Sequence, residues 1–494
     1  MPDNINDQVH KNHMKSILII SLFIIVPASY AQEYPEYGVK VETVADNLSV
    51  PWSIDFAPDG RIFFTERGGT LWVIQNQSKP QPIMSFDVSG GEGGLLGITL
   101  DPQFEQNHFV YLYFTYNDFF ETKNKVVRYL ESENTLIEEM VLVEPFTGAS
   151  YHDGGRIRFG PDGKLYVTTG DAGIPAMSQN KDSVIGKILR INSDGTIPEN
   201  NPFGTQVYSF GHRNPQGIDW NKNGMMFSTE HGPSGWRGTA HDEINKIVPG
   251  GNYGWPEIIG DEIGTDMIRP ILHSGEDTWA PSGATFYYGE KIPQWTGKFF
   301  IATLRGEHLH MISFDEDEIS SHERLFEGEF GRLRDVVESP EGDIYLLTSN
   351  KDGRGKSSPN DDKILKIIPI HSINSFEECI DEGSVIESHP RQCTTRDGLH
   401  FVEEISHVPS WIKQIAKWWS SSEISDEEFS SCFEYLINNS IIRVPPSIVA
   451  EKEPEIEIPL WLRINVDKWV QGLTSDEEFL KNIKWMIENG FIKT

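Results

Sequence analysis

Four short motifs in the middle of the chain contain the residue types that an enzyme active site needs. They occupy residues 151–156 (Tyr-His-Asp-Gly-Gly-Arg), 170–173 (Gly-Asp-Ala-Gly), 211–217 (Gly-His-Arg-Asn-Pro-Gln-Gly) and 230–233 (Glu-His-Gly-Pro). Each motif adjoins an alternating apolar run, for example residues 164–169 or 226–229. The polar residues therefore fall where strands end and loops begin, which is where a rigid β scaffold places its binding and catalytic groups.

His152 and Asp171 are the motif residues best suited to proton transfer. His152 precedes Asp-Gly-Gly, so it lies on a loop with little bulk, and a positioned neutral imidazole is the usual general base near neutral pH. Asp171 follows a strand and could orient the imidazole and stabilise its protonated form. The alternatives are a hydrogen-bonded spectator histidine and an aspartate that only closes a turn after Gly170.

Arg213 and Asn214 form the core of the most specific motif in the chain. Arginine offers planar donors to ligand oxygens, and asparagine can donate and accept hydrogen bonds at once, so the pair suits an oxygen-rich ligand. The alternative is that Arg213 ties two structural units together.

A second group of arginines lies further along the chain. Arg332 and Arg334 are two residues apart, so they share one face of a strand, and Arg305 comes from the preceding unit. Such a cluster suits a ligand with several carboxylates. The alternative is a set of surface ion pairs with Asp335 or Glu338.

Acidic residues near the motifs could bind a metal ion or a ligand. Asp242 and Glu243 could hold a structural Ca²⁺, a hard ion that prefers oxygen ligands, or they could form a solvated turn. Glu92, in the glycine-rich run 91–97, could accept a substrate hydroxyl or contact a cofactor. A carboxylate at that position is unfavourable beside an anionic group.

A short sequence pattern that predicts a turn followed by a strand recurs six times and indicates the fold. We call this pattern the turn phrase. Three clear copies begin at residues 57, 160 and 339, and weaker copies begin near residues 100, 221 and 295. Proline pre-sets such a turn and glycine supplies the positive φ that closes it. Six similar antiparallel units packed radially make an all-β, six-bladed β-propeller. A β-sandwich is the alternative, but it does not need the same phrase six times.

The whole chain limits the classes of function. Its 494 residues predict a large first domain, placed at 38–370, with smaller parts behind it. The formal net charge of −32 disfavours nucleic acid and anionic membranes as partners. Residues 1–31 are predicted to be a secretory signal peptide, because lysines precede a short apolar run and small residues follow it. The mature protein is then expected to be secreted or extracytoplasmic, with no later membrane span.

The C-terminal part has two further sections. Residues 371–406 are predicted to be a small loop-rich segment, where Cys379 and Cys393 could close a disulfide, whereas Cys432 is expected to pack as a small hydrophobe. Residues 407–494 contain two helical repeats, 408–442 and 458–492, joined by an acidic proline-rich linker. The repeats resemble short tryptophan-containing extensions of exported archaeal proteins, which suggests surface or protein attachment.

The tryptophans of the repeats are expected to be mainly core. Trp411 corresponds to Trp461 and Trp419 to Trp469, at helical spacing. The alternative is an exposed platform for stacking on sugar rings. The second helix of each repeat is expected to open with a serine capping box.

Over roughly residues 40 to 370, the order, spacing and residue types of the motifs resemble those of the soluble quinoprotein sugar dehydrogenases. These enzymes are β-propellers that carry pyrroloquinoline quinone (PQQ). The resemblance implies oxidation of an aldose sugar at its anomeric carbon to a lactone, with Ca²⁺ as a second cofactor and an external electron acceptor. It implies that His152 is the general base and that Asp171 lies beside it, and His152, Asp171 and Arg213 are the expected catalytic residues.

The same resemblance assigns ligand contacts. It places Arg213, Asn214, Glu92 and the cluster of Arg305, Arg332 and Arg334 around PQQ, and it assigns Ca²⁺ to the backbone carbonyls of Gly232 and Pro233. Two other classes stay open. A metal-dependent lactonase on a propeller would hold its ion with side-chain carboxylates and would not need the arginine cluster, and a non-catalytic carbohydrate- or protein-binding propeller would not need His152 or Arg213.

Overall fold

The computed structural model describes residues 31–76, 78–233, 240–315 and 318–370, and in the C-terminal part 384–386, 392–394, 400–402, 408, 411–439, 441–442, 444 and 458–493. The chain divides into two compact units, and the boundary follows Ile370. The proposed leader up to residue 30 and most of the proposed linker between the helical repeats lie outside the described residues. Within the described part of the chain, no helix is long and apolar enough to cross a membrane.

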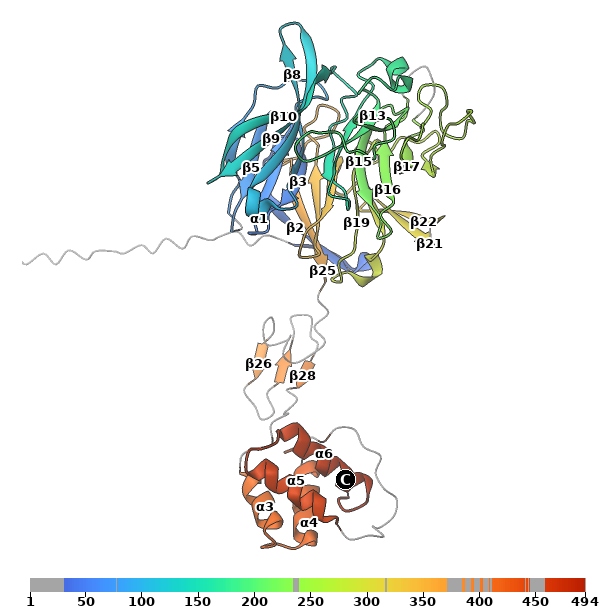
Figure 1. Ribbon diagram of the computed structural model, residues 1–494. Coiled ribbons are helices and arrows are strands. Elements are labelled where there is room, and N and C mark those ends of the chain that lie inside the picture. Colours follow the sequence, from blue (N-terminus) through green and yellow to red (C-terminus); the bar gives the residue numbers. More distant parts are fainter. Residues whose placement is uncertain are drawn as a thin grey trace, which may run out of the picture. The chain divides into compact units, whose positions relative to one another are not determined.

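The first unit is a ring of six antiparallel sheets, or blades, taken in chain order (Figure 1). Blade 1 contains β3 (Pro51–Phe56), β4 (Ile62–Glu66), β5 (Thr70–Ile74) and β6 (Gln81–Ser85). Blade 2 contains β7 (Leu95–Leu100), β8 (Phe109–Asp118), β9 (Glu121–Ser132) and β10 (Thr135–Thr147). Blade 3 contains β11 (Ile157–Phe159), β12 (Leu165–Thr169), β13 (Lys187–Ile191) and β14 (Val207–Phe210).

The remaining blades follow the same plan. Blade 4 contains β15 (Pro215–Trp220), β16 (Met226–Glu230), β17 (Glu243–Ile247) and β18 (Leu272–His273). Blade 5 contains β19 (Pro281–Phe286), β20 (Phe299–Thr303), β21 (Leu309–Asp315) and β22 (Glu318–Leu325). Blade 6 contains β23 (Leu333–Glu338), β24 (Ile344–Thr348), β25 (Ile364–Pro369), β2 (Val39–Ala45) and β1 (Gln32–Tyr34). The predicted six-bladed propeller is confirmed.

Each of the six recurring turn phrases precedes the second strand of its blade. In blade 1 the Gly60 amide donates to the Ala57 carbonyl at 3.0 Å, and in blade 3 Gly163 donates to Gly160 at 2.9 Å. Gly60 and Gly163 have φ angles of 85° and 70°, a region that favours glycine. The phrase is therefore the tight turn between the first and second strands, which explains why it occurs once per blade.

The first strands of the blades lie against one another around the centre of the ring. β3 contacts β7, β7 contacts β11, β15 contacts β19, β19 contacts β23, and β23 contacts β3. Because these strands converge, loops at one end of the strands bring together residues that are far apart in the sequence.

A buried arginine links four blades at this centre. Arg156 forms an ion pair with Asp335 at 2.7 Å and also donates to Ser53 Oγ and the Gln216 carbonyl, both at 3.0 Å. Its guanidinium also lies over the ring of Trp52, 4.4 Å from the centroid. Arg156 and Asp335 are almost fully buried, so this ion pair belongs to the core of the ring.

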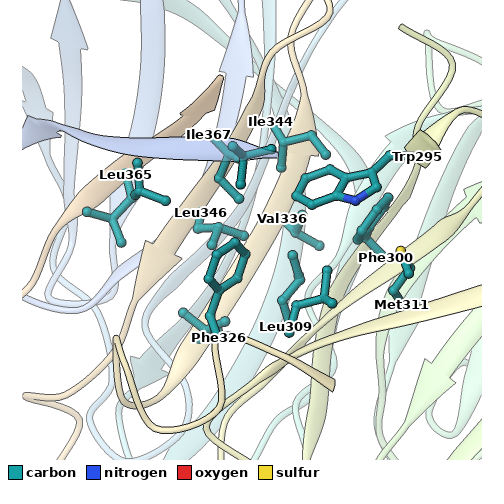
Figure 2. Packing of buried hydrophobic residues seen from close by; sticks show 14 of the residues in the cluster. Trp295, Phe300, Leu309, Met311, Phe326, Val336, Ile344, Leu346, Leu365 and Ile367 are labelled. Atoms are coloured by element: carbon teal, nitrogen blue, oxygen red, sulfur yellow. The ribbon is translucent and has the colours of Figure 1, made fainter. Parts of the chain in front are cut away.

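The ring is closed by pairing between a strand near the start and a strand near the end of the first unit. β2 pairs antiparallel with β25, with Val39 opposite Pro369 and Thr43 opposite Leu365. Residues of β2 then join the apolar core between blades 5 and 6, whose packing is shown in Figure 2. The labelled members include Trp295, Phe300, Leu309, Val336, Ile344, Leu346, Leu365 and Ile367.

The described part of the second unit begins with a small antiparallel sheet. Its strands are β26 (Ser384–Ile386), β27 (Gln392–Thr394) and β28 (His400–Val402), in the order β26-β27-β28. Cys393 is fully buried and disulfide-bonded, while Cys379 lies outside the described residues. Cys432 is a free thiol packed against the apolar core of the helices, as expected.

The other described residues of the second unit include four helices. They are α3 (Ile412–Ser420), α4 (Asp426–Asn438), α5 (Leu460–Val470) and α6 (Asp476–Glu488). Ser425 and Glu428 form the predicted capping box, and Ser475 accepts a hydrogen bond from the Glu478 amide. Each repeat is therefore a pair of helices with the second helix capped by its own serine.

The two repeats contact each other crosswise through their tryptophans. Arg463 of the second repeat lies over Trp419 of the first, and Lys413 of the first lies over Trp469 of the second. Trp419 and Trp469 are fully buried, as expected for core residues. The expectation is wrong for Trp411 and Trp461, which are 51% and 44% exposed, because the buried face of each helix runs through the next residue instead, Ile412 in α3 and Leu462 in α5.

Candidate functional site

The four motifs come together at one end of the ring. Residues 151–156 follow β10, residues 170–173 follow β12, residues 211–214 lead into β15, and residues 230–233 end β16 and continue beyond it. Two adjoining cavities lie there, with volumes of about 250 and 580 Å³. We call the first the arginine cavity, lined by Arg67, Arg332, Arg334 and Arg354 among others, and the second the histidine cavity, lined by Tyr151, His152, Arg213 and Gly232 among others.

His152 is held by Asp171 as the sequence predicts. Nδ1 of the imidazole lies 2.8 Å from Oδ1 of Asp171. Burial alone would raise the pKa of Asp171, but hydrogen bonds from His152, Gly173 and Trp255 outweigh it and hold that pKa below its ordinary value. An ionised Asp171 can only accept a hydrogen bond here. In the neutral imidazole the proton is therefore on Nδ1, and Nε2 has the lone pair. This is the tautomer that a general base requires.

Asp171 also closes a turn after Gly170, which was the alternative role considered for it from the sequence. The Gly173 amide donates to Asp171 Oδ1 at 2.9 Å, the geometry of an Asx turn. The same carboxylate thus fixes its own loop and the imidazole.

A close backbone approach brings the His152 loop onto the Asp171 loop. A Cβ atom at Gly170 would lie 2.0 Å from the His152 carbonyl oxygen, so only glycine fits there. His152 itself has a φ of 61°, and its carbonyl accepts a hydrogen bond from the Ala172 amide at 3.1 Å. The imidazole therefore stands on a loop that is fixed at both its backbone and its ring.

Arg213 and Asn214 divide their contacts between the two cavities. Arg213 donates to the His231 carbonyl at 3.1 Å and lies over the Trp255 ring, with its side chain in the wall of the histidine cavity. Asn214 lies in the wall of the arginine cavity, where its Oδ1 accepts from the Gly154 amide at 3.1 Å and from Gln216 at 3.2 Å. Among the described residues, Arg213 forms no ion pair.

Glu92 lies in the wall of both cavities. Its Oε2 accepts a hydrogen bond from the His152 amide at 3.1 Å, and its Oε1 pairs with Arg354 at 2.8 Å. Glu92 therefore connects the His152 loop to a loop of blade 6.

Arg332 and Arg334 both line the arginine cavity, as their spacing predicts, but their partners differ from those considered from the sequence. Arg332 pairs with Asp352 at 2.8 Å. Arg334 is buried, and among the residues that the structure describes it donates only to neutral acceptors, Gln216 Oε1 at 3.2 Å and Ser282 Oγ at 3.3 Å. Burial lowers the pKa of Arg334 to about 9, which shows how unfavourable this buried charge is without an anion.

Arg305 lies at the edge of this arrangement. Its exposed side chain lines the histidine cavity and makes no hydrogen bond or ion pair with any residue that the structure describes. It is therefore available to a ligand, and no contact with a described residue fixes its direction.

A protein-family model described as glucose/sorbosone dehydrogenase matches residues 48–364. The chain belongs to this family. A relative from Escherichia coli, the aldose sugar dehydrogenase YliI, is 30% identical over 72% of this chain and 99% of its own length. Quinoprotein glucose dehydrogenase B from Acinetobacter calcoaceticus is 30% identical over 57% of this chain and 67% of its own length.

A solved structure shows the same similarity. The PQQ-bound aldose sugar dehydrogenase from Streptomyces coelicolor is 36% identical, with a TM-score of 0.60 over 69% of this chain and 99% of that one. As a glucose/sorbosone dehydrogenase family member, the chain is identified as an oxidoreductase of the sugar dehydrogenase type, built on a six-bladed propeller.

Several residues of the site were not predicted from the sequence. Arg67, between β4 and β5, lines the arginine cavity, and Arg354 lines both cavities. Trp255 donates from Nε1 to Asp171 Oδ2 at 2.9 Å. His231 stands in the motif at residues 230–233, but its buried Nε2, which has no hydrogen-bond partner among the described residues, was not predicted. Arg67, Arg354 and Trp255 lie outside the four motifs, although Arg67 stands in a short glycine-containing run, Glu-Arg-Gly-Gly.

The residues proposed for Ca²⁺ fall into two groups. Gly232 and Pro233 line the histidine cavity, and the Gly232 amide donates to Asp242 Oδ1 at 3.0 Å. Asp242 Oδ2 accepts from the amides of Trp279 and Ala280 at 2.7 and 2.8 Å. These contacts favour a structural role for Asp242 over ion binding. Within the described ranges, no group of three or more His, Cys, Asp or Glu residues could hold a metal.

Proposed function

We propose that this protein oxidises aldose sugars at the anomeric carbon to lactones, with PQQ as the bound oxidant and an external electron acceptor that regenerates it. The observation that carries the proposal is the pair of cavities, one lined by arginines and the other by a histidine held in the base tautomer. Membership of the sugar dehydrogenase family and the likeness to a PQQ-bound aldose sugar dehydrogenase support it.

The arginine cavity fits an anionic cofactor. Arg334 is a buried cation without a carboxylate partner, and its Nε has no hydrogen-bond partner among the described residues. Arg67 and Arg305 likewise have no ion pair within the described part of the chain. A buried cation is stable only when a counter-charge accompanies it, and PQQ carries three carboxylates. Arg334, Arg332, Arg67 and Asn214 would hold it from the arginine cavity, with Arg213 and Arg305 on the other side.

PQQ supplies an acceptor for the hydride that leaves the anomeric carbon. In the proposed reaction His152 Nε2 takes the proton of the anomeric hydroxyl, which lets the C1–O bond become a carbonyl as the hydride departs. Asp171 stabilises the imidazolium that results. Two electrons leave the sugar in this step, and the external acceptor removes them afterwards.

Gly232 and Pro233 are the proposed carbonyl ligands of Ca²⁺, which accepts backbone oxygens readily. A Cβ at Gly232 would lie 1.7 Å from the Ala240 carbonyl oxygen, so the sequence needs glycine at this position. The Asp242 contact to the Gly232 amide fixes the orientation of this backbone segment. Asp242 and Glu243 themselves stay a weaker proposal for a second ion.

The decisive experiment compares wild-type protein with His152→Ala and His152→Gln, each loaded with PQQ and Ca²⁺ and assayed by dye reduction with a panel of aldoses. We expect turnover to fall by at least about a hundredfold, the usual contribution of a general base, while PQQ still binds. Full activity in His152→Ala would disprove the assignment of the base. Lactone hydrolysis without dye reduction by the wild type would instead support the lactonase class.

The site of action is also a proposal. A leader at residues 1–31 would place the enzyme outside the cytoplasm, where the buried disulfide of Cys393 is stable. Mass spectrometry of the mature N-terminus tests this, and a chain that keeps residue 1 would contradict it.

A further inference from the structure

The ion pair between Glu92 and Arg354 lies where the two cavities meet and connects the loop between blades 1 and 2 to a loop of blade 6. Oε1 of Glu92 is 2.8 Å from the Arg354 guanidinium, while Oε2 accepts the His152 amide at 3.1 Å. The side chains are 29% and 67% exposed, respectively. Both residues line both cavities. One carboxylate therefore contacts the backbone of His152 and a cation at the rim of the arginine cavity.

The loop that carries Arg354 is fixed by the arginine cluster itself. Asp352 Oδ1 accepts from the amides of Arg354 and Gly355 at 2.8 and 3.2 Å, and its Oδ2 accepts from Arg332 Nε at 2.8 Å. The Asp352 side chain is only 3% exposed. A continuous set of polar contacts thus runs from Arg332 through Asp352 and the Arg354 loop to Glu92 and the backbone of His152.

Glu92 poses an electrostatic problem for the proposed function. A carboxylate in the wall of a cavity built for an anion repels that anion, and the repulsion grows where solvent is excluded. Glu92 cannot simply be dispensed with, because it holds the His152 amide. A cation placed on the free oxygen of Glu92 cancels its charge and leaves the hydrogen bond in place.

We propose that Arg354 is a positioning residue that neutralises and orients Glu92, so that this carboxylate can hold the His152 loop beside an anionic cofactor without repelling it. The inference rests on the proposed function. Arg354 acts here through Glu92 and not by direct contact with the cofactor. For the stability of the fold, an ion pair this exposed contributes little.

A double-mutant cycle on cofactor affinity tests this inference. PQQ is titrated calorimetrically, with Ca²⁺ present, into the apo forms of wild type, Arg354→Ala, Glu92→Gln and the double variant. We expect Arg354→Ala to weaken PQQ binding by about tenfold or more, because it leaves Glu92 charged and unpaired. In the Glu92→Gln background the same change should weaken binding by less than about threefold, because no charge is left to neutralise.

Two matched variants exclude a merely structural effect. Arg354→Lys keeps the charge and should restore most of the affinity. Arg324→Ala removes another exposed arginine that pairs with acids, Asp277 and Glu327, outside the site, and should leave affinity unchanged. The melting temperature of apo Arg354→Ala should match that of wild type, and its affinity deficit should shrink as salt screens Glu92.

The outcomes separate this inference from the proposed function. If wild-type protein binds no PQQ, both fail. If wild type binds PQQ but Arg354→Ala weakens it equally in both backgrounds, Arg354 contacts the cofactor directly and the inference is wrong. An unchanged affinity in Arg354→Ala would overturn it as well.

Discussion

The indole of Trp255 donates from Nε1 to Oδ2 of Asp171 at 2.9 Å, on the carboxylate oxygen opposite the one that holds His152. Trp255 also lies under the guanidinium of Arg213, 5.4 Å from the ring centroid. One residue from blade 4 thus connects the carboxylate behind the proposed base to an arginine in the cavity wall. Asp171 is thereby fixed from two sides, which keeps the imidazole in one orientation.

Asp171→Asn should lower turnover by at least about tenfold, because an amide can hold His152 in the wrong tautomer. Trp255→Phe removes only the second hydrogen bond and should give a smaller loss. PQQ affinity should change little in Asp171→Asn, since this residue does not line either cavity. Steady-state dye reduction and cofactor titration measure the two quantities, and a tenfold loss of affinity in Asp171→Asn with normal turnover would contradict the assignment.

The lowered pKa of Asp171 predicts a pH dependence of stability. A carboxyl whose folded pKa lies below its unfolded value stabilises the protein above the unfolded value, about 3.9, and this contribution disappears as the pH falls through the folded value. The difference in unfolding free energy between wild type and Asp171→Asn should therefore be largest above about pH 5 and shrink toward pH 3. Denaturant titrations of apo protein across this range test it, and a difference that grows toward acid would contradict it.

Arg334→Met should separate cofactor binding from folding. Removing a buried and unpaired charge relieves its desolvation cost, so the apo variant should melt at the wild-type temperature or above it. The rise in melting temperature that PQQ gives the wild type should be lost, because a ligand at free concentration L stabilises the fold by RT ln(1 + L/Kd), which vanishes once Kd far exceeds the PQQ concentration. Thermal melts with and without PQQ measure both effects. An apo variant that melts well below wild type would show that Arg334 is structural.

The ion pair of Arg156 and Asp335 should behave in the opposite way. Arg156→Met leaves Asp335 buried without its partner and should lower the free energy of unfolding by about 3 kcal/mol or more. The double variant Arg156→Met with Asp335→Leu should recover part of this loss, because no unpaired charge remains. Urea titration gives both values, and equal losses in the single and double variants would place the cost in the contacts of Arg156 to Ser53 and Gln216 instead.

A chain that ends after Ile370 keeps every strand of the propeller and should fold, bind PQQ and oxidise aldoses at a near-normal rate. The boundary of the compact units lies there, and the described sites lie before it. The matched control starts at Leu48 and lacks β2, which pairs with β25; it should fail to fold. Soluble, cofactor-loaded but inactive truncated protein would show that the second unit contributes to the reaction.

Local sequence patterns were enough to predict the number of blades of the propeller and the site residues that lie next to glycine-rich loops. The six turn phrases are local signals, and each marks one blade. His152, Asp171 and Asn214 stand in motifs whose glycines allow close backbone approach. The spacing of Arg332 and Arg334 predicted one shared face of a strand; both side chains line the arginine cavity, although β23 begins at Leu333, one residue after Arg332.

The contacts that complete the site could not be read in the same way. Trp255, Arg354 and Asp352 reach the site from loops without a recognisable pattern, and their partners come from other blades. The alternative considered for Arg332, an ion pair with Asp335, fails for the same reason: Asp335 is close in sequence but is paired with Arg156 from blade 3, and Arg332 pairs with Asp352. Helical spacing likewise placed Trp419 in the core but gave no sign that Trp411, at a helix start, would be exposed.

The pairing of β2 with β25 has a consequence for the order of events during biosynthesis. β2 is synthesised before the strands of blades 1 to 5, whereas its partner β25 is synthesised only after them. Until then the nascent first unit exposes a strand edge and the apolar residues of β2, Val39 and Val41, that are later covered. Contacts between such distant segments form slowly and leave intermediates prone to aggregation. We therefore expect this protein to fold well only if the exposed edge of β2 is kept from associating with other chains until β25 has been synthesised.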